Sequence, residues 1–245
     1  MPTEYDEAKQ QVRRRVWDAL DAASATYNDT AHGRIPNFKG SDQAAEQLAA
    51  LPVWKAATNI KAVPDKAQLP VRARALEEGK TVYMAVPKLA TPRPFYLLDP
   101  AALTVPPTEA ASSRVAASVA PTVDVDGLRP IQVVVLGSVA VNRDGVRIGK
   151  GAGYSDLEFA LLTEAGLIST DTLVVTTVHH LQVVDSPIPA TEHDVSVDLI
   201  ITPDEVISCP APHRPSGILW DRLAPEKIAA IPALQRRASG TRNVR

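Results

Sequence analysis

The sequence predicts an α/β domain with three layers (α/β/α), in which helices cover both faces of a mainly parallel sheet. Short apolar runs rich in β-branched residues alternate with segments whose apolar residues recur at helical spacing. Such alternation requires right-handed crossovers between parallel strands, and these place helices on both faces of the sheet. The 245 residues, 45% of them hydrophobic, are enough to fill one sizeable core. We expect this domain to span residues 1–207, followed by a proline-rich C-terminal extension over residues 208–245.

The composition limits the classes of partner. A formal net charge of -2 and a pI near 6.2 provide no overall attraction to nucleic acid or to anionic lipid, so we expect neither partner. Cys209 is the single cysteine, which excludes an intramolecular disulfide and argues against a structural zinc site. The N-terminal segment is charged, and no run approaches the roughly 18 apolar residues of a membrane span. We therefore expect a cytoplasmic protein that acts on a small molecule as a monomer or homodimer.

The first expected element is an amphipathic helix over residues 4–25. Lys9 and Arg13 are four residues apart and therefore lie on one face of this helix. Two like charges on one face repel each other, so either they flank solvent or an anion sits between them. The spacing alone favours the solvated face.

The chain then continues as alternating helices and strands up to residue 117. Prolines recur between residues 87 and 107, where we expect a long irregular segment over one face of the sheet. The expected elements are a helix from Ser41, as N-cap, to Ala57, a strand at Asn59–Val63, a helix at Leu69–Glu78 closed by Gly79, a strand at Lys80–Val86, a strand-like piece at Phe95–Leu98 and a helix at Thr108–Ala117.

The second half centres on a strand, a glycine-rich loop and a helix. The strand is expected over Ile131–Val141 and the helix from Tyr154 to Ala165, with Gly166 as its C-terminal cap. The elements expected after it are strands at Thr172–Val178 and Val195–Thr202, a proline-rich bridge at Cys209–Pro215, a short helix at Pro225–Arg237 broken at Pro232 and a disordered basic end at Arg236–Arg245.

The loop between that strand and helix is the strongest candidate for a ligand site. It reads Gly-Val-Arg-Ile-Gly-Lys-Gly-Ala-Gly-Tyr, and it differs from both the dinucleotide fingerprint and the Walker A loop. Glycines allow close approach to backbone N–H groups, and a helix N-terminus favours anions. We interpret the loop as a phosphate cradle, and the alternative is a hairpin whose cations face water. The residues expected at the phosphates are Gly145, Arg147, Gly149, Lys150, Gly151, Gly153 and Tyr154.

Two aspartates near this loop are candidates for a metal site. Asp156 lies on the first turn of the following helix, and Asp194 precedes the last expected strand. Mg²⁺ binds few carboxylates and takes its other ligands from phosphate and water. The alternatives are stabilisation of a helix dipole by Asp156 and a turn or helix cap at Asp194.

The histidines give weaker indications. His179 and His180 are adjacent in an expected strand, so their side chains should point to opposite faces and cannot chelate together. His193 is a better candidate for the wall of a site, although a hydrogen-bonded structural histidine is equally consistent. No Ser/His/Asp or Cys/His arrangement indicates a covalent mechanism, so catalysis would rely on electrostatics.

The motif Gly145-x-Arg-Ile-Gly-x-Gly-x-Gly-Tyr-x-Asp156 resembles the signature loop of the 5-formyltetrahydrofolate cyclo-ligase family, also called methenyltetrahydrofolate synthetases. Lys9 and Arg13 resemble the basic pair on that family's first helix, and the segment from His193 to Asp198 resembles its closing motif. The resemblance covers roughly residues 5 to 205. The segments most similar to the branch of methenyltetrahydrofolate synthase domain-containing proteins are Gly33–Gly40, Gly137–Val141, Arg147–Gly151 and Ser216–Trp220.

The resemblance implies ATP as co-substrate and Mg²⁺ as metal. In that family the formyl oxygen of 5-formyltetrahydrofolate attacks the γ-phosphate, N10 closes the ring, and phosphate leaves to give 5,10-methenyltetrahydrofolate. Such chemistry requires positioning and charge neutralisation more than a protein nucleophile. By similarity, the loop, Lys9 and Arg13 would hold the phosphates, Asp156 and Asp194 would hold Mg²⁺, and the catalytic residues would be Arg147, Lys150 and Tyr154.

The chain departs from the family pattern at two places. Tyr154-Ser-Asp-Leu157 stands where the enzymes usually have Tyr-Tyr-Asp-Arg. Val63-Pro-Asp-Lys66 stands where they have a Pro-x-Glu segment whose carboxylate reads the pterin. The alternative to a cyclo-ligase is therefore a nucleotide-binding paralogue without folate turnover, either regulatory or acting on another heterocyclic metabolite.

Overall fold

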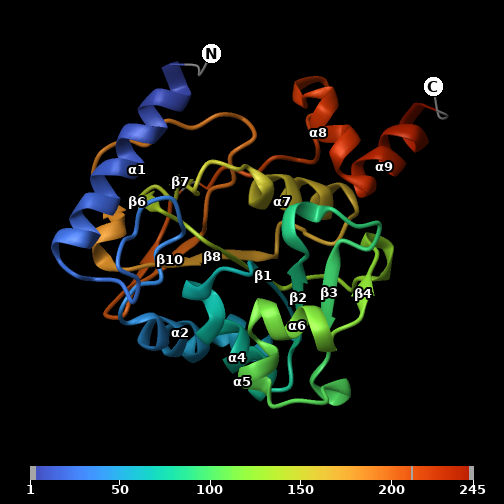
Figure 1. Ribbon diagram of the computed structural model, residues 1–245, viewed down its shortest axis with the longest axis horizontal. Helices are drawn as coiled ribbons and strands as arrows, with labels where there is room; N and C mark the ends of the chain where they lie inside the picture. The colour runs from blue at the N-terminus through green and yellow to red at the C-terminus, as the bar shows by residue number, and fades with distance from the viewer. Residues whose placement is uncertain (1–3, 211, 243–245) are drawn as a thin grey trace.

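The described chain, residues 4–210 and 212–242 of this computed structural model, builds an eight-stranded sheet with helices on both faces (Figure 1). The pairs from β10 through β8, β5 and β1 to β2 are parallel, and the pairs β2–β3, β3–β4 and β10–β11 are antiparallel. The predicted three-layer α/β/α fold with a mainly parallel sheet is confirmed. In spatial order the strands are β11 (Val206–Ser208), β10 (Leu199–Ile201), β8 (Leu173–Thr177), β5 (Val133–Leu136), β1 (Asn59–Ala62), β2 (Thr81–Ala85), β3 (Phe95–Leu98) and β4 (Thr122–Val123).

The central strands are buried on both faces, as parallel strands between two helical layers must be. Along β5, Val133 and Val135 belong to one apolar core, and Val134 and Leu136 belong to the other.

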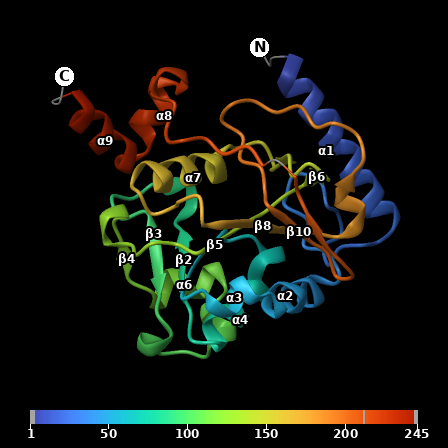
Figure 2. The ribbon, with the colours of Figure 1, turned by 180° about the vertical axis from the view of Figure 1, so that it is seen from behind.

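Among the described helices, none combines the length and apolar character needed to cross a membrane. The first core includes α1 (Glu4–Ala22), α2 (Ser41–Ala50), α3 (Pro52–Ala56), α4 (Leu69–Glu77), α5 (Pro107–Ala110) and α6 (Ser113–Val119), and the second includes α7 (Tyr154–Glu164), α8 (Pro225–Ala230) and α9 (Pro232–Arg242) (Figures 1 and 2).

The expected strand Ile131–Val141 is wrong, because this stretch forms two strands in different sheets. After β5 ends, the chain turns at Gly137 and Ser138 into β6 (Ala140–Asn142), which pairs with β7 (Arg147–Ile148) and β9 (Val183–Val184). The turn is stabilised by the Ser138 hydroxyl, which lies 2.8 Å from the hydroxyl of Thr176 on β8. The β6–β7 hairpin therefore lies beyond the carboxyl end of β5, where parallel sheets bind ligands.

Two expected helices are divided. The helix predicted from Ser41 to Ala57 is split into α2 and α3, because Pro52 has no N–H to continue α2 and instead begins α3. Ser41 is not the N-cap, since Gly40 occupies that position and Ser41 is buried in the first turn. The stretch 108–117 is likewise shared between α5 and α6.

The two proline-rich segments also differ from expectation. Residues 87–107 do not cross a face of the sheet as one irregular segment, because β3 pairs with β2 and extends its edge. The break at Pro232 is confirmed, and it separates α8 from α9. The end expected to be disordered is helical over residues 236–242, while residues 243–245 lie outside the described chain. The division of the chain at residue 207 stays a prediction.

A buried ion pair crosses the second core. Lys61 on β1 donates to Glu158 on α7, and the two side chains are 1% and 6% exposed. Removing two charges from water costs free energy that only the pair itself offsets, so each group depends on the other. The pair thus couples the position of α7 to the central strand of the sheet.

Replacing Lys61 alone should destabilise the protein strongly. Lys61→Ala leaves the Glu158 carboxylate buried without its partner, and we expect the free energy of unfolding in urea to fall by about 3 to 5 kcal/mol. The double variant Lys61→Met with Glu158→Leu removes both charges and should recover most of that loss. A single variant as stable as the wild type would show that the pair does not couple these elements.

Candidate functional site

The first half of the glycine-rich loop is a β-hairpin, which is the alternative that the sequence left open. The Asn142 carbonyl accepts the N–H of Gly145 at 2.9 Å, and the Asn142 side chain accepts the N–H of Val146 at 3.0 Å. Gly145 has a φ of 86°, and its carbonyl accepts the N–H of Val197 at 2.9 Å. A Cβ at this position would lie 2.3 Å from the Val197 carbonyl oxygen. Gly145 is therefore required by the packing of the hairpin against the segment before β10.

Arg147 lies beneath the loop and does not face water, in contrast to the hairpin alternative. Only 3% of the residue is exposed. Its Nε donates to the Ser138 hydroxyl at 3.2 Å, its Nη2 to the Gly137 carbonyl at 2.9 Å and its Nη1 to Oδ1 of Asp156 at 2.9 Å. Because all three nitrogens have protein partners, Arg147 holds Asp156 in position, and its charge is already compensated by that carboxylate.

Asp156 connects the start of α7 to the segment before β10. Gly153 occupies the N-cap position of α7 with a left-handed φ of 66°, so the loop enters the helix directly at this point. Oδ1 of Asp156 accepts the backbone N–H of Val195 at 3.1 Å as well as Arg147 Nη1. The helix dipole favours a negative charge at this end of α7, so it stabilises the Asp156 carboxylate, whose side chain is 19% exposed.

Lys9 and Asp194 form an ion pair between α1 and the segment before β10. Lys9 Nζ donates to Asp194 Oδ2 at 2.6 Å, and the N–H and hydroxyl of Thr191 donate to the same oxygen at 2.6 and 3.0 Å. Burial acts to raise the pKa of Asp194, but the hydrogen bonds from Lys9 and Thr191 and the Lys9 charge outweigh it and lower the pKa. Asp194 is therefore ionised at neutral pH.

Arg13 extends from α1 to the second half of the loop. Its Nε donates to the Gly149 carbonyl at 2.7 Å, and a Cβ added to Gly151 would lie 3.7 Å from the Arg13 Cζ. Burial lowers the pKa of Arg13, while the charges of Asp6 and Asp194 act in the opposite direction. The solvated face favoured by spacing alone is wrong, because Lys9 pairs with Asp194 and Arg13 donates to the loop.

Lys150 and Tyr154 contact different parts of the protein. Lys150 Nζ lies 3.4 Å from Oδ1 of Asp65, which follows the carboxyl end of β1, and 48% of the lysine side chain is exposed. The Tyr154 ring lies 5.0 Å from Nζ of Lys227 on α8. The loop therefore contacts two sides of the site: the carboxyl end of β1 and the C-terminal extension.

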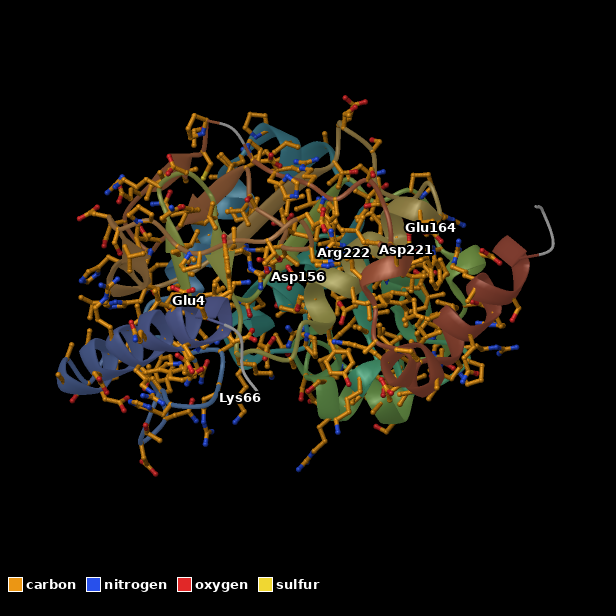
Figure 3. All side chains as sticks on the ribbon, turned by 90° about the horizontal axis from the view of Figure 1, so that it is seen from above. Glu4, Lys66, Asp156, Glu164, Asp221 and Arg222 are labelled. Carbon is orange, nitrogen blue, oxygen red and sulfur yellow. The ribbon has the colours of Figure 1, made fainter. Side chains whose placement is uncertain are left out.

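Asp156 and Asp194 line one pocket of about 330 Å³ beside the N-terminus of α7. Gly153 and His193 also line it, so the structure places His193 in the wall of the candidate site. Figure 3 shows Asp156 near Arg222, with Glu164 further along the same helix. The other lining residues come from α7 and the extension: Leu157, Ala160, Pro215, Gly217, Ile218, Leu219, Arg222, Leu223, Ala224 and Lys227.

The carboxylates of this pocket suit a hard divalent cation that is also held by phosphate. Asp156 uses Oδ1 and Asp194 uses Oδ2 for the hydrogen bonds described above. Among residues 4–210 and 212–242, Asp156 Oδ2 and Asp194 Oδ1 have no hydrogen-bond partner, and no cluster of three or more His, Cys, Asp or Glu side chains suits a metal. Two available carboxylate oxygens match Mg²⁺ bound together with substrate phosphates better than a cage made only of protein ligands.

The expectation for the paired histidines is wrong. His179 and His180 lie after β8, and their ring centroids are 4.1 Å apart, so they do not point to opposite faces. His179 Nδ1 accepts the backbone N–H of Leu181, and the backbone N–H of His179 donates to the Gln182 side chain. His179 is thus the N-cap of a short 3-10 helix, and the alternation expected of a strand does not apply to it.

The sequence model of the 5-formyltetrahydrofolate cyclo-ligase family matches residues 5–203. This match covers most of the chain, including α1, the glycine-rich loop and both aspartates of the pocket. The chain belongs to the 5-formyltetrahydrofolate cyclo-ligase family.

The relatives agree with this assignment. The methenyltetrahydrofolate synthase domain-containing protein of Mus musculus is 39% identical over 240 residues, which cover 96% of this chain and 64% of that protein. The Homo sapiens protein of the same name is 37% identical over 233 residues, covering 93% of this chain and 61% of that protein. The chain therefore spans less than two thirds of the length of these relatives.

A solved structure shows the same fold. The NMR structure of Aquifex aeolicus 5,10-methenyltetrahydrofolate synthetase matches with a TM-score of 0.53 and 19% identity, over 85% of this chain and 94% of that chain. At this identity the likeness is one of fold.

Gly145→Ala should destabilise the protein much more than Gly33→Ala. Both glycines have positive φ, but a Cβ at Gly33 meets nothing within 4 Å, whereas one at Gly145 meets the Val197 carbonyl oxygen. We expect losses in the free energy of unfolding of about 1 kcal/mol at Gly33 and about 3 kcal/mol or more at Gly145. Equal losses in urea denaturation would show that the hairpin does not pack against Val197 in this way.

Proposed function

We propose that this protein is an ATP- and Mg²⁺-dependent ligase of the cyclo-ligase type, which converts 5-formyltetrahydrofolate to 5,10-methenyltetrahydrofolate in the cytoplasm. The observation that carries this proposal is the pocket in which Asp156 and Asp194 meet at the N-terminus of α7. Family membership supplies the reaction class, and the pocket supplies groups that suit a metal-bound polyphosphate.

The protein's own residues would bind the phosphates through backbone and side-chain donors. The first backbone N–H groups of α7 have no carbonyl partner within the helix, and Gly153 lets a phosphate approach them closely. Arg13 and Lys9 add positive charge from α1. Arg147 would act as a positioning residue, because it donates one hydrogen bond to Asp156 while two others hold it to Ser138 and Gly137.

Asp156 and Asp194 would hold Mg²⁺, which supplies neutralisation of the charge that develops on the transferred phosphoryl group. Lys150 and Tyr154 lie on the two sides of the loop, where they would orient the substrates. A reaction of this kind needs its substrates held close and in line more than it needs a protein nucleophile. The network of loop, cations and carboxylates meets that need.

One observation favours an alternative, a nucleotide-binding paralogue without folate turnover. Asp65 lies where the family resemblance places a substrate-reading carboxylate, and Lys150 Nζ lies 3.4 Å from it. A carboxylate that is paired with a lysine is less available to a pterin ring. Because Lys150 is 48% exposed, the pair is weak enough for a substrate to displace.

Asp156→Asn should lower the rate of product formation by about 100-fold, because it removes a charge that holds the metal. The measurement is the absorbance of the methenyl product formed from 5-formyltetrahydrofolate in the presence of ATP and Mg²⁺. The control is Asp171→Asn, which changes an exposed aspartate in a turn before β8 and should leave the rate unchanged. No product from the wild-type protein at high enzyme concentration would contradict the cyclo-ligase proposal.

Calorimetry separates the two candidates. A cyclo-ligase should bind Mg·ATP and 5-formyltetrahydrofolate, whereas the paralogue should bind Mg·ATP alone. Binding of neither compound would exclude both candidates.

A further inference from the structure

The C-terminal extension lies directly over the candidate site. The family match ends at residue 203, but seven of the residues that line the pocket lie between Pro215 and Ala224, and Lys227 follows on α8. The match to the Mus musculus relative covers 96% of the chain and so continues past residue 203 into this segment. The pocket wall formed by residues 215–227, which we name the outer wall, is therefore outside the part of the chain that defines the family.

The outer wall is attached to the domain at two places, Glu164 and Glu192. The N–H of Ile218 and the indole Nε1 of Trp220 both donate to Oε2 of Glu164 on α7, at 3.3 and 3.1 Å. Closer to the metal-binding candidates, Arg222 Nε lies 3.4 Å from Oε1 of Glu192, two residues before Asp194.

Beyond the outer wall, α9 is also attached to the domain. Leu234 is fully buried in the second core, and Arg236 donates to both carboxylate oxygens of Asp124 at 2.6 and 3.0 Å. The segment is thus a packed part of the domain, so its side chains have defined positions at the pocket.

Lys227 is the cation that the outer wall places nearest the loop. Its Nζ donates to the Ala152 carbonyl at 3.1 Å and lies 5.0 Å from the centre of the Tyr154 ring. A Cβ added to Gly153, the N-cap residue of α7, would be 3.5 Å from the same Nζ. The ammonium group therefore lies beside the helix N-terminus at which the phosphates would bind.

The charge of Lys227 is less compensated than the charges of three other cations around the loop. Lys9 is paired with Asp194, Arg147 with Asp156 and Lys150 with Asp65. Lys227 has a carbonyl and an aromatic ring as partners, and among the described residues it forms no salt bridge. Arg222 and Lys227 are the arginine and lysine that line the pocket, and Arg222 already faces the Glu192 carboxylate. An anion that enters this pocket would therefore be attracted more strongly by Lys227.

We propose that the outer wall completes the nucleotide site and that Lys227 binds its polyphosphate directly. This inference rests on the proposed function for the identity of the ligand, and it adds a binding residue from beyond the family match. It makes the C-terminal extension part of the binding site itself.

The test measures the affinity of the full chain for Mg·ATP and for Mg·tripolyphosphate by calorimetry. Lys227→Met should weaken both by about tenfold, because the charged contact is made with the phosphates and not with the base. Lys227→Arg keeps the charge and should bind within about threefold of wild type. Lys55→Met, an exposed lysine on α3, is the matched control and should bind as wild type does.

The outcomes separate this inference from the proposed function. If Lys227→Met binds both compounds like the wild type, the role of Lys227 is overturned, while the cyclo-ligase proposal still depends on product formation alone. If Lys227→Arg binds as weakly as Lys227→Met, the charge is not what matters and the role is overturned as well. If the wild type binds neither compound, both proposals fail.

Discussion

The candidate site depends on one buried interaction, the ion pair between Arg147 and Asp156. Arg147 is held by Gly137 and Ser138 at the carboxyl end of β5, and it holds Asp156 on the first turn of α7. Asp156 in turn accepts the N–H of Val195. A single guanidinium thus fixes three segments around the pocket. Its planar arrangement of donors suits this task, because it can hold a carboxylate, a carbonyl and a hydroxyl in one plane.

The charges around the glycine-rich loop are arranged in two halves. On the phosphate side, Asp156 joins the loop to α7, Asp194 joins α1 to the segment before β10, and Arg13 joins α1 to the loop. On the other side, Asp65 and Lys150 form a looser, partly exposed pair. The first half is fixed by buried contacts, whereas the second can rearrange at little cost. This difference is why metal-bound phosphate is the better supported part of the proposed function, and why the proposed second substrate depends on family membership.

The sequence was sufficient for the fold class, because helical and strand periodicity report burial directly, whereas the position of the site stays a prediction. The sequence did not predict the features that depend on tertiary contacts, such as where a strand ends or which side chains are buried. In the stretch Ile131–Val141, apolar residues flank Gly137 and Ser138 on both sides, and this dipeptide alone does not show that the chain passes to a second sheet there. Arg147 was recognisable as a site residue, but its burial beneath Asp156 depends on the packing of the hairpin. Lys227 carries no local signal at all, since it reaches the Ala152 carbonyl through the return of the chain to the N-terminus of α7.

Hydrogen exchange of the full chain with and without Mg·ATP tests the central claim most directly, because it locates the ligand without assuming a reaction. Protection on nucleotide binding is expected in the second half of the loop and the first turns of α7, in residues 191–195 and in the outer wall. These segments are distant in sequence and meet only at the pocket. Protection confined to other segments, such as residues 87–107, would contradict a nucleotide site between α7 and the outer wall.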